Sequence, residues 1–341
     1  MSSELREEIF KGLKVVGEDS EGEYGYFPDR RPVHELLRYG FVPLDKPAGQ
    51  LSHQVVAWVR RLASVDSAGH SGTLDPMATG LLPVAINEAT KALSTLLLGP
   101  KEYYAVMRLH SPVPDSELLQ VLDEFTTEIY QRPPQRSSVR RVTRTRTVYE
   151  MELVERRGNL ALIRVLCQAG TYVRKLIYDM GEVLGVGATM TELRRTKVCN
   201  IKESDGLVRL QELALAFKHY REKGDEALLR KTIWPVERAV QHLKKVVVKD
   251  SAVDPLCHGA MLAAPGLARI SMDIEKQDVV AIYTQKAELV GFGISLVNSA
   301  AMEEAEKGFV VRVDRVVMPT GSYPHYRKGA EIKEELQAGS I

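Results

Sequence analysis

The chain has 341 residues, more than one hydrophobic core usually holds, so about two domains of ~100–200 residues each are expected. Its net charge of +1, with 44% hydrophobic and 27% charged residues, is that of an ordinary soluble globular protein. No apolar run approaches the ~20 residues of a membrane helix, no secretory signal is seen, and the three cysteines form no CxxC pair. We therefore expect a reducing, cytoplasmic compartment, with no membrane association and no cysteine-rich metal site.

The first third of the chain is predicted to alternate strands with helices. A short strand runs into a Pro-Gly turn over 39–49, and a helix follows over 52–63 with Ser52 as its expected N-cap. A glycine-rich loop comes next. An apolar strand over 81–87 then leads into a helix over 87–100.

The same alternation continues through the middle of the chain. Residues 101–110 alternate as a half-buried strand in which Tyr103 heads the inward-facing row. An amphipathic helix is predicted over 115–130, a hairpin turns at 157–159, and a helix over 171–185 has Thr171 as its expected N-cap. This order of elements favours a mixed α+β sheet domain.

The last part of the chain differs in pattern. Short strands separated by Gly and Pro occupy about 246–320, and a small β-barrel is the natural closure for such strands. The predicted fold class is thus α+β, a mixed-sheet catalytic domain followed by a small β-barrel. The expected divisions are an N-terminal extension over 1–25, the catalytic domain over 26–245, the barrel over 246–325 and a polar tail over 326–341.

One loop carries a single acid in a constrained setting. In "GHSGTLDPMATG", which runs from Gly69 to Gly80, Asp75 precedes Pro76. A residue before proline is pushed toward extended geometry and away from a helix. Asp75 is therefore expected on a bend, with its carboxylate free to point at a partner or substrate.

A second segment is strongly basic. Six arginines occur before the first acid of this segment, Glu150: Arg132, Arg136, Arg140, Arg141, Arg144 and Arg146. Guanidinium groups bind phosphate bidentately, and the interspersed Ser and Thr hydroxyls add donors. The segment is a candidate RNA-binding site, although a solvated basic loop would have the same composition.

Two cations stand at the start of the helix predicted over 171–185. Arg174 and Lys175 fall in its first turn, where they oppose the partial positive charge of the helix N-terminus. An anion should therefore lie nearby, and a carboxylate from another loop or an RNA phosphate would serve. Asp75 is the leading carboxylate candidate.

Eight ordered motifs of the sequence resemble the TruB-type pseudouridine synthases, and most closely their archaeal dyskerin-type branch. The motifs are "LDKPAG" (44–49), "GHSGTLDP" (69–76), "ATGLLPV" (78–84), "EATK" (88–91), "KEYYAVMRLH" (101–110), "RPPQRSSV" (132–139), "GTYVRKL" (170–176) and "ELRRT" (192–196). In addition, "CHGAMLAAPG" (257–266) resembles the start of that branch's PUA RNA-binding domain. The sequence departs from the family pattern at Met77 and in the segment that follows Thr196.

The resemblance implies an isomerase that converts specific uridines of RNA to pseudouridine. Asp75 matches the catalytic aspartate, the nucleophile of the reaction. The implied substrate-binding residues are His70, Tyr103, Tyr172, Arg174 and Leu193. Arg174 would hold the carboxylate ionised and in place, and Tyr103 would stack on the extruded base. Lys46 and Pro47 match a motif that supports the catalytic loop.

The resemblance also implies what binds the protein. Its partners would be an H/ACA guide RNA, rRNA targets, the T-loop uridine of tRNA as a further target, and small protein subunits of the H/ACA particle. The isomerisation needs no metal and no cofactor.

Two other classes of protein fit the sequence less well. A catalytically silent RNA-binding scaffold is disfavoured by the retained Asp75, Tyr103, Tyr172 and Arg174. A glycosidase is disfavoured because it normally needs a second carboxylate near the first, and the loop has none.

Overall fold

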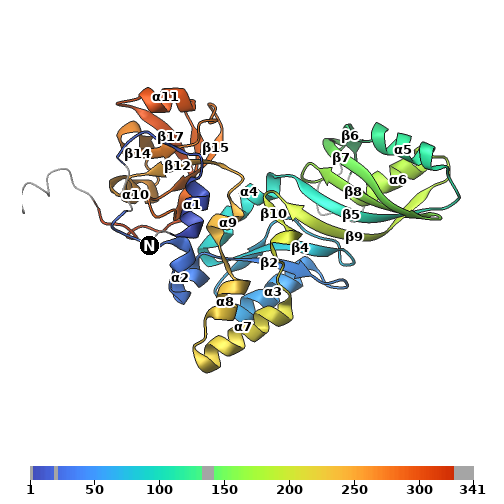
Figure 1. Ribbon diagram of the computed structural model, residues 1–341, viewed down its shortest axis with the longest axis horizontal. Coiled ribbons are helices and arrows are strands. Elements are labelled where there is room, and N and C mark those ends of the chain that lie inside the picture. The colour runs from blue at the N-terminus through green and yellow to red at the C-terminus, as the bar shows by residue number, and fades with distance from the viewer. Residues whose placement is uncertain (1–2, 19–21, 133–141, 326–341) are drawn as a thin grey trace, which may run out of the picture. The chain divides into compact units, whose positions relative to one another are not determined.

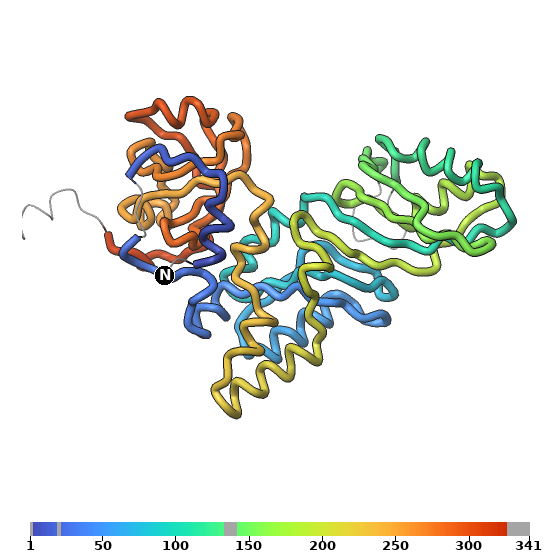
Figure 2. The backbone as a smooth tube through the Cα atoms, in the orientation of Figure 1, coloured from blue at the N-terminus to red at the C-terminus, as the bar shows by residue number. Residues whose placement is uncertain are grey.

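The computed structural model describes residues 3–18, 22–132 and 142–325 and separates into two compact units. The larger unit is Phe41–Ile233, and the smaller unit combines Met1–Gly40 with Trp234–Ile341. Figures 1 and 2 show both units. This grouping differs from the divisions expected at residues 26 and 246, because the N-terminal residues join the C-terminal part of the chain.

The larger unit is built on one mixed sheet, with strand order β2-β4-β9-β5-β8-β7-β6 and with β3 paired to β4 and β10 to β9. Its strands are β2 (Gly40–Lys46), β3 (Ala68–His70), β4 (Thr79–Ile86), β5 (Lys101–Leu109), β6 (Glu128–Gln131), β7 (Arg144–Arg157), β8 (Leu160–Cys167), β9 (Ala188–Val198) and β10 (Ile201–Lys202). Its helices are α3 (Ser52–Ala63), α4 (Leu93–Leu98), α5 (Asp115–Glu124), α6 (Val173–Val183), α7 (Leu210–Lys223) and α8 (Ala227–Thr232), with 3₁₀ segments η2 (Asn87–Ala92) and η3 (Glu203–Asp205).

The inward row of β5 organises one core of the larger unit. Ala105, Met107 and Leu109 are buried together with apolar residues of α5, α6 and β8, and Tyr103 packs against the same cluster. The alternation predicted for 101–110 is therefore confirmed. In Figure 1, α5 and α6 lie on the same side of this part of the sheet.

Two predicted helices differ from the structure. The helix predicted over 115–130 ends at Glu124, because the chain turns there and β6 pairs with β7. The helix predicted over 87–100 is split into η2 and α4. These differences arise because strand pairing and packing override local propensity.

Both expected N-caps are displaced by one residue. Leu51 and not Ser52 occupies the N-cap of α3, because the Ser52 hydroxyl is bonded to Leu74. Tyr172 and not Thr171 precedes α6, and the Thr171 hydroxyl donates to the Gln168 carbonyl at 2.8 Å.

The smaller unit is a curled sheet with strand order β1-β14-β12-β15-β16-β17-β13. Its strands are β1 (Lys14–Val15), β12 (Lys244–Val248), β13 (Leu262–Ala263), β14 (Leu267–Ile270), β15 (Val279–Tyr283), β16 (Leu289–Ser295) and β17 (Phe309–Val316), and the two-residue β11 (Trp234–Pro235) begins the second chain segment. The helices are α1 (Glu4–Phe10), α2 (Val33–Arg38), α9 (Val236–Ala239), α10 (Asp250–Cys257) and α11 (Ser299–Glu304), with η1 (Pro28–Arg30) and η4 (Ala264–Gly266).

A buried ion pair ties the N-terminal residues into this unit. Arg31 donates to both carboxylate oxygens of Glu237, at 2.9 and 2.7 Å, and it lies 3.6 Å from Glu288. Arg31 and Glu237 are almost completely buried. Strand β1 adds backbone bonds to β14, so the N-terminal segment is part of the same folded body.

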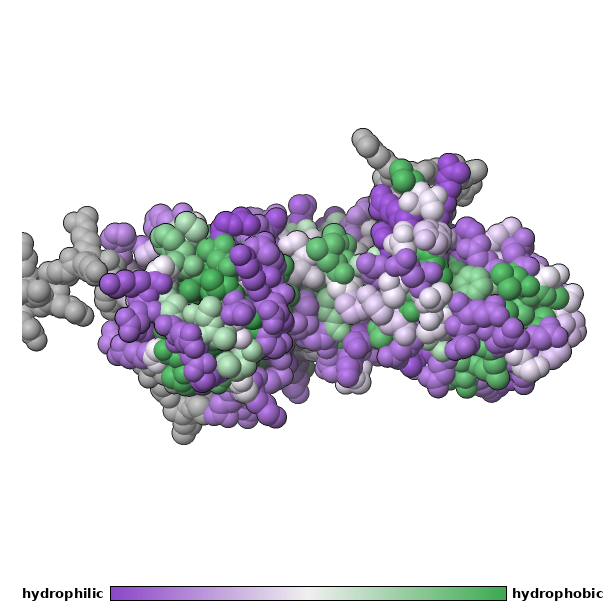
Figure 3. All heavy atoms as spheres, turned by 90° about the horizontal axis from the view of Figure 1, so that it is seen from above, coloured by the Kyte–Doolittle hydropathy of each residue, from purple (hydrophilic) through white to green (hydrophobic). Residues whose placement is uncertain are grey.

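The surface is mixed in character. Figure 3 shows hydrophilic residues interspersed with smaller apolar patches on each unit. Within the part of the chain that the structure describes, no helix is both long and apolar enough to cross a membrane.

Candidate active site

The loop that carries Asp75 connects β3 to β4, and hydrogen bonds from Lys46 hold it in place. The Lys46 ammonium is fully buried and donates to the carbonyl oxygens of Pro47, Pro76 and Ala78 at 2.9, 3.0 and 2.8 Å. Burial lowers the pKa of Lys46, and the nearby Asp75 carboxylate acts in the opposite direction. The two bonds to carbonyls just after the acid, those of Pro76 and Ala78, fix the path of the loop, as the motif resemblance implied for Lys46.

Two further contacts close the loop. The Ser52 hydroxyl donates to the Leu74 carbonyl at 3.1 Å and accepts from the Leu74 amide at 3.0 Å. The backbone turns at Gly72, whose φ of +79° is in the left-handed region that favours glycine. The residue before Asp75 therefore has both backbone groups bonded to one serine of α3.

Asp75 forms an ion pair with Arg174, a residue 99 positions away at the start of α6. Both side chains remain about half exposed, at 47% and 59%. The ion pair confirms that Asp75 is the carboxylate expected to balance the cations of this helix. It also leaves the carboxylate accessible to a substrate.

Tyr103 lies on β5 and contacts a buried arginine that sequence reasoning missed. Arg195, on β9, lies directly opposite Tyr103 in the pairing of the two strands. Burial raises the pKa of the Tyr103 phenol, although the Arg195 charge acts to lower it, so its hydroxyl stays protonated at neutral pH. Leu193 is half-buried on the same strand as Arg195 and pairs with Ala105 of β5.

His70 ends β3, at the start of the loop. Its ring is half-buried, and its Nδ1 atom has no hydrogen-bond partner among the described residues. Burial, with the Arg195 charge as a second cause, lowers the pKa of His70 below its ordinary 6.5. The imidazole is therefore neutral at physiological pH, and its Nδ1 atom is buried.

Tyr172 stands at the N-terminus of α6 and is held by a buried glutamine. The Gln131 side chain accepts from the Tyr172 amide at 2.9 Å and donates to its carbonyl at 3.2 Å. Gln131 is the last residue of β6. It thus joins the beginning of the arginine-rich segment to the helix that carries Arg174.

The structure describes only part of the arginine-rich segment. Arg132 and Arg144 are exposed, whereas Arg146 is partly buried beside Gly170. Arg136, Arg140 and Arg141 lie outside the described residues. Arg144 and Arg146 lie on β7, where it pairs with β6, and Arg132 directly follows Gln131, the last residue of β6.

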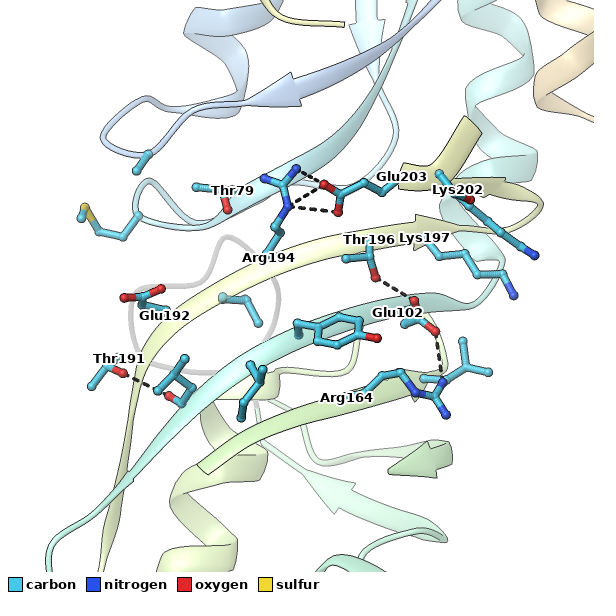
Figure 4. Close-up of a pocket in the computed structure, with 18 of the residues that line it drawn as sticks. Thr79, Glu102, Arg164, Thr191, Glu192, Arg194, Thr196, Lys197, Lys202 and Glu203 are labelled. Carbon is cyan, nitrogen blue, oxygen red and sulfur yellow. Dashed lines mark hydrogen bonds and ion pairs between the residues drawn. The ribbon is translucent and has the colours of Figure 1, made fainter. Parts of the chain in front are cut away.

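A cavity of about 1100 Å³ extends along β5 and β9. Its lining includes Glu102, Tyr104 and Arg194, which alternate along these strands with Tyr103 and Arg195. Figure 4 shows Arg164 and Arg194 engaged with carboxylates inside it, and Arg164 binds Glu102 at 3.1 Å. Leu193 and Met77, which stands two residues after Asp75, also line the cavity, so it adjoins the loop that carries Asp75.

Comparison with family models covers most of the chain. Residues 60–117 match the TruB family pseudouridylate synthase (N terminal domain), and 174–241 match the tRNA pseudouridylate synthase B C-terminal domain. Residues 244–317 match the PUA domain and 17–56 the DKCLD (NUC011) domain.

Whole-chain relatives extend these matches. The probable tRNA pseudouridine synthase B of Pyrobaculum arsenaticum is 48% identical, over 92% of this chain and 94% of the relative. The protein of the same name from Pyrococcus furiosus is 44% identical, over 95% of each chain.

Similar solved structures belong to the same group of proteins as these relatives. A chain of a Cbf5-Nop10-Gar1 complex has 45% identity and a TM-score of 0.87, covering 92% of this chain and 96% of that one. A chain of an H/ACA RNP bound to a substrate RNA containing 2′-deoxyuridine has 44% identity and a TM-score of 0.84, with the same coverage.

The mixed-sheet unit with its looped carboxylate, joined to a PUA domain, defines an RNA-modifying enzyme of the pseudouridine synthase class, an isomerase. The chain belongs to the TruB family, as a dyskerin-type member that carries a PUA domain.

Sequence reasoning missed Arg195, Gln131 and the loop contact of Ser52. Only Arg195 left a usable signal: two adjacent arginines in a strand cannot both face water when one face is buried. Gln131 and Ser52 are polar residues whose partners are distant in sequence, and no local pattern marks them.

Proposed function

We propose that the protein is a guide-RNA-directed pseudouridine synthase that isomerises rRNA uridines and also the T-loop uridine of tRNA. Asp75 is its nucleophile, and His70, Tyr103, Tyr172, Arg174 and Leu193 bind the target nucleotide. The observation that carries the proposal is the half-exposed ion pair between Asp75 and Arg174. The loop that carries Asp75 is also held by hydrogen bonds from Lys46 and Ser52.

The reaction needs what this arrangement offers. The N1–C1′ bond of uridine breaks and a C5–C1′ bond forms, while C5 loses a proton and N1 gains one, so no oxidant or reductant is consumed. A carboxylate can form the covalent intermediate with either the sugar or the base. Arg174 pairs with the Asp75 carboxylate and holds it in place, and the half-exposed position lets an extruded nucleotide reach it.

RNA recognition is assigned to two regions. Arg132, Arg144 and Arg146, with Arg136, Arg140 and Arg141 of the same segment, bind phosphates next to the reaction centre. The PUA domain binds the guide RNA or tRNA. The similar solved chains come from complexes whose names also include Nop10 and Gar1, which supports small protein subunits as partners. The place of action is the cytoplasm.

The decisive experiment follows the C5 proton. RNA made with 5-³H-uridine is offered in three forms: a tRNA transcript, a target RNA annealed to a guide RNA, and the second form with small partner proteins added. Tritium release, with mapping of the modified position, is the expected result in the guided reaction. If no form releases tritium, the chain is the alternative, a silent RNA-binding scaffold. Tritium release that survives Asp75→Asn would instead show that Asp75 is not the nucleophile.

The scaffold alternative predicts a different pattern. It would bind guide RNA with unchanged affinity after Asp75→Asn, and it would release no tritium with or without the substitution. Because RNA binding is measured separately by gel shift, the two functions are distinguished in one set of samples.

A further inference from the structure

Arg195 occupies a central position in the larger unit. On β9 it lies opposite Tyr103 of β5 and beside Gly80 of β4. A Cβ atom on Gly80 would come within 2.3 Å of the Arg195 carbonyl oxygen, so the two backbones approach too closely for another residue. The place of Arg195 is therefore set by the backbones of three strands.

The guanidinium group connects three parts of the unit. Its Nε atom donates to the Leu81 carbonyl at 2.8 Å, and Nη2 donates to the Gly72 carbonyl at 3.0 Å. Tyr103 lies directly opposite Arg195 on the neighbouring strand β5. Gly72 stands three residues before Asp75, so one side chain that is 1% exposed binds the catalytic loop next to the tyrosine.

The placement of Tyr103 opposite Arg195 has a chemical consequence. A guanidinium group can only donate hydrogen bonds, so toward Arg195 the Tyr103 oxygen can act only as an acceptor. The hydroxyl proton is then free to point to another acceptor.

The charge of Arg195 adds to this effect. Among the described residues, its hydrogen-bond partners are two backbone carbonyls, without a carboxylate. Burial raises the pKa of Tyr103, and the Arg195 charge acts against that rise. Any negative charge that develops on the Tyr103 oxygen during proton transfer is thereby favoured.

We infer that Arg195 is a positioning residue for the isomerisation, which fixes the Tyr103 hydroxyl relative to the Asp75 loop. The inference rests on the proposed function and deepens it. It differs from a purely structural role because it requires the effect of Arg195 on turnover to pass through one hydroxyl group.

A double-mutant cycle tests this requirement. Full-length proteins carrying Arg195→Gln, Tyr103→Phe or both are assayed for single-turnover tritium release from the two labelled RNAs, the tRNA transcript and the guided target. Arg195→Gln should slow turnover on the order of 10²-fold, the effect of misplacing a reacting group by about an ångström. In the Tyr103→Phe background the further loss should be no more than about twofold, the scatter of additive effects.

Two comparisons separate positioning from folding. Arg195→Lys, which keeps a buried donor and the charge, should recover part of the rate, and RNA affinity should be unchanged in every variant. Arg194→Gln is the matched control, because Arg194 faces the other side of β9 and binds Asp45 and Glu203. It should leave turnover unchanged.

The outcomes are distinct. Equal losses from Arg195→Gln in the two backgrounds, a parallel loss of RNA affinity, or failure of both the Gln and the Lys variants to melt as folded proteins would each assign Arg195 to the fold alone. Absence of tritium release by the unaltered protein would instead overturn the proposed function, and this inference with it.

Discussion

At the scale of single residues, the proposed reaction depends on where the Asp75 carboxylate is held and on its ion pair with Arg174. Asp75 is half exposed, yet the backbone on both sides of it is fixed by Lys46 and Ser52. The acid therefore combines access with a defined position, which a nucleophile needs.

Replacing Asp75 should separate catalysis from binding. Asp75→Asn removes the nucleophile at nearly constant shape, so pseudouridine formation should be abolished while the melting temperature stays close to that of the unaltered protein. Asp75→Glu should also lose on the order of 10²-fold in rate, because one methylene displaces the carboxylate by roughly an ångström. Chemical mapping of pseudouridine measures both. Appreciable turnover by Asp75→Asn would contradict the mechanism.

Tyr103 offers a second test at this scale. Tyr103→Phe keeps the aromatic face and loses the hydroxyl, so RNA affinity should be nearly unchanged. Turnover should fall by about 10²–10⁴-fold if the hydroxyl takes part in proton transfer. Gel-shift affinity and single-turnover rates give the two values. An unaltered rate would limit Tyr103 to stacking.

At the scale of elements, His70 at the end of β3 makes the free energy of unfolding depend on pH. The pKa of His70 in the folded protein lies below its ordinary 6.5, chiefly because of burial. As the pH falls below 6.5, the unfolded chain takes up a proton that the folded chain does not. The contribution to stability is therefore present above that pH and is lost as the pH falls through the folded-state pKa.

His70→Asn should remove this dependence. The free energy of unfolding, measured in urea at several values between about pH 7.5 and 5.5, should fall less steeply on acidification in the variant. His34, which is exposed, provides the control as His34→Asn, and its profile should follow the unaltered protein. Parallel profiles for all three proteins would show that His70 titrates alike in both states.

The strand ends of β6 and β7 make a second prediction at this scale. Arg132 and Arg144 are exposed there, and each phosphate they contact releases counterions on binding. A double Arg132→Ala, Arg144→Ala variant should bind guide RNA more weakly, with the slope of log affinity against log salt reduced by roughly 0.7–0.9 per lost contact. Fluorescence anisotropy at several salt concentrations measures the slope, and an unchanged slope would remove both residues from the RNA-binding surface.

At the scale of the whole molecule, the smaller unit depends on both ends of the chain. Strand β1 pairs with β14, and Arg31 is paired with Glu237 in the interior. A truncation that removes only the C-terminal strands would leave β1 without its partner. Point substitutions are therefore the better probe of this unit.

Breaking the buried pair should be costly. Glu237→Gln removes the carboxylate that binds the Arg31 cation at 2.9 and 2.7 Å, and the Glu288 carboxylate is more distant, so the free energy of unfolding of this unit should fall by about 3–5 kcal/mol. Glu35→Gln, which breaks the more exposed pair with Arg38 at 3.4 Å, should cost at most about 1 kcal/mol. Calorimetry compares the two, and similar effects would show that burial does not set the strength of the Arg31 pair.

The sequence by itself determined the α+β class, the inward row of β5, the hairpin of β7 and β8, and the motifs that identify the family. These features depend on residues close together in the chain, whose periodicity and spacing are visible directly. Even the meeting of Asp75 and Arg174 could be anticipated, because two cations at a helix start call for an anion.

Only the tertiary structure decided the role of Ser52, Gln131 and Arg195, and the union of the N-terminal segment with the C-terminal sheet. The Ser52 hydroxyl had two possible uses, a cap for α3 or a bond to Leu74, and folding of the loop selected the second. Arg195 gains its partners from β4, β5 and the loop, which meet only when the sheet forms. Long-range pairing sets such positions, and no local pattern contains it because the partners lie far apart in the chain.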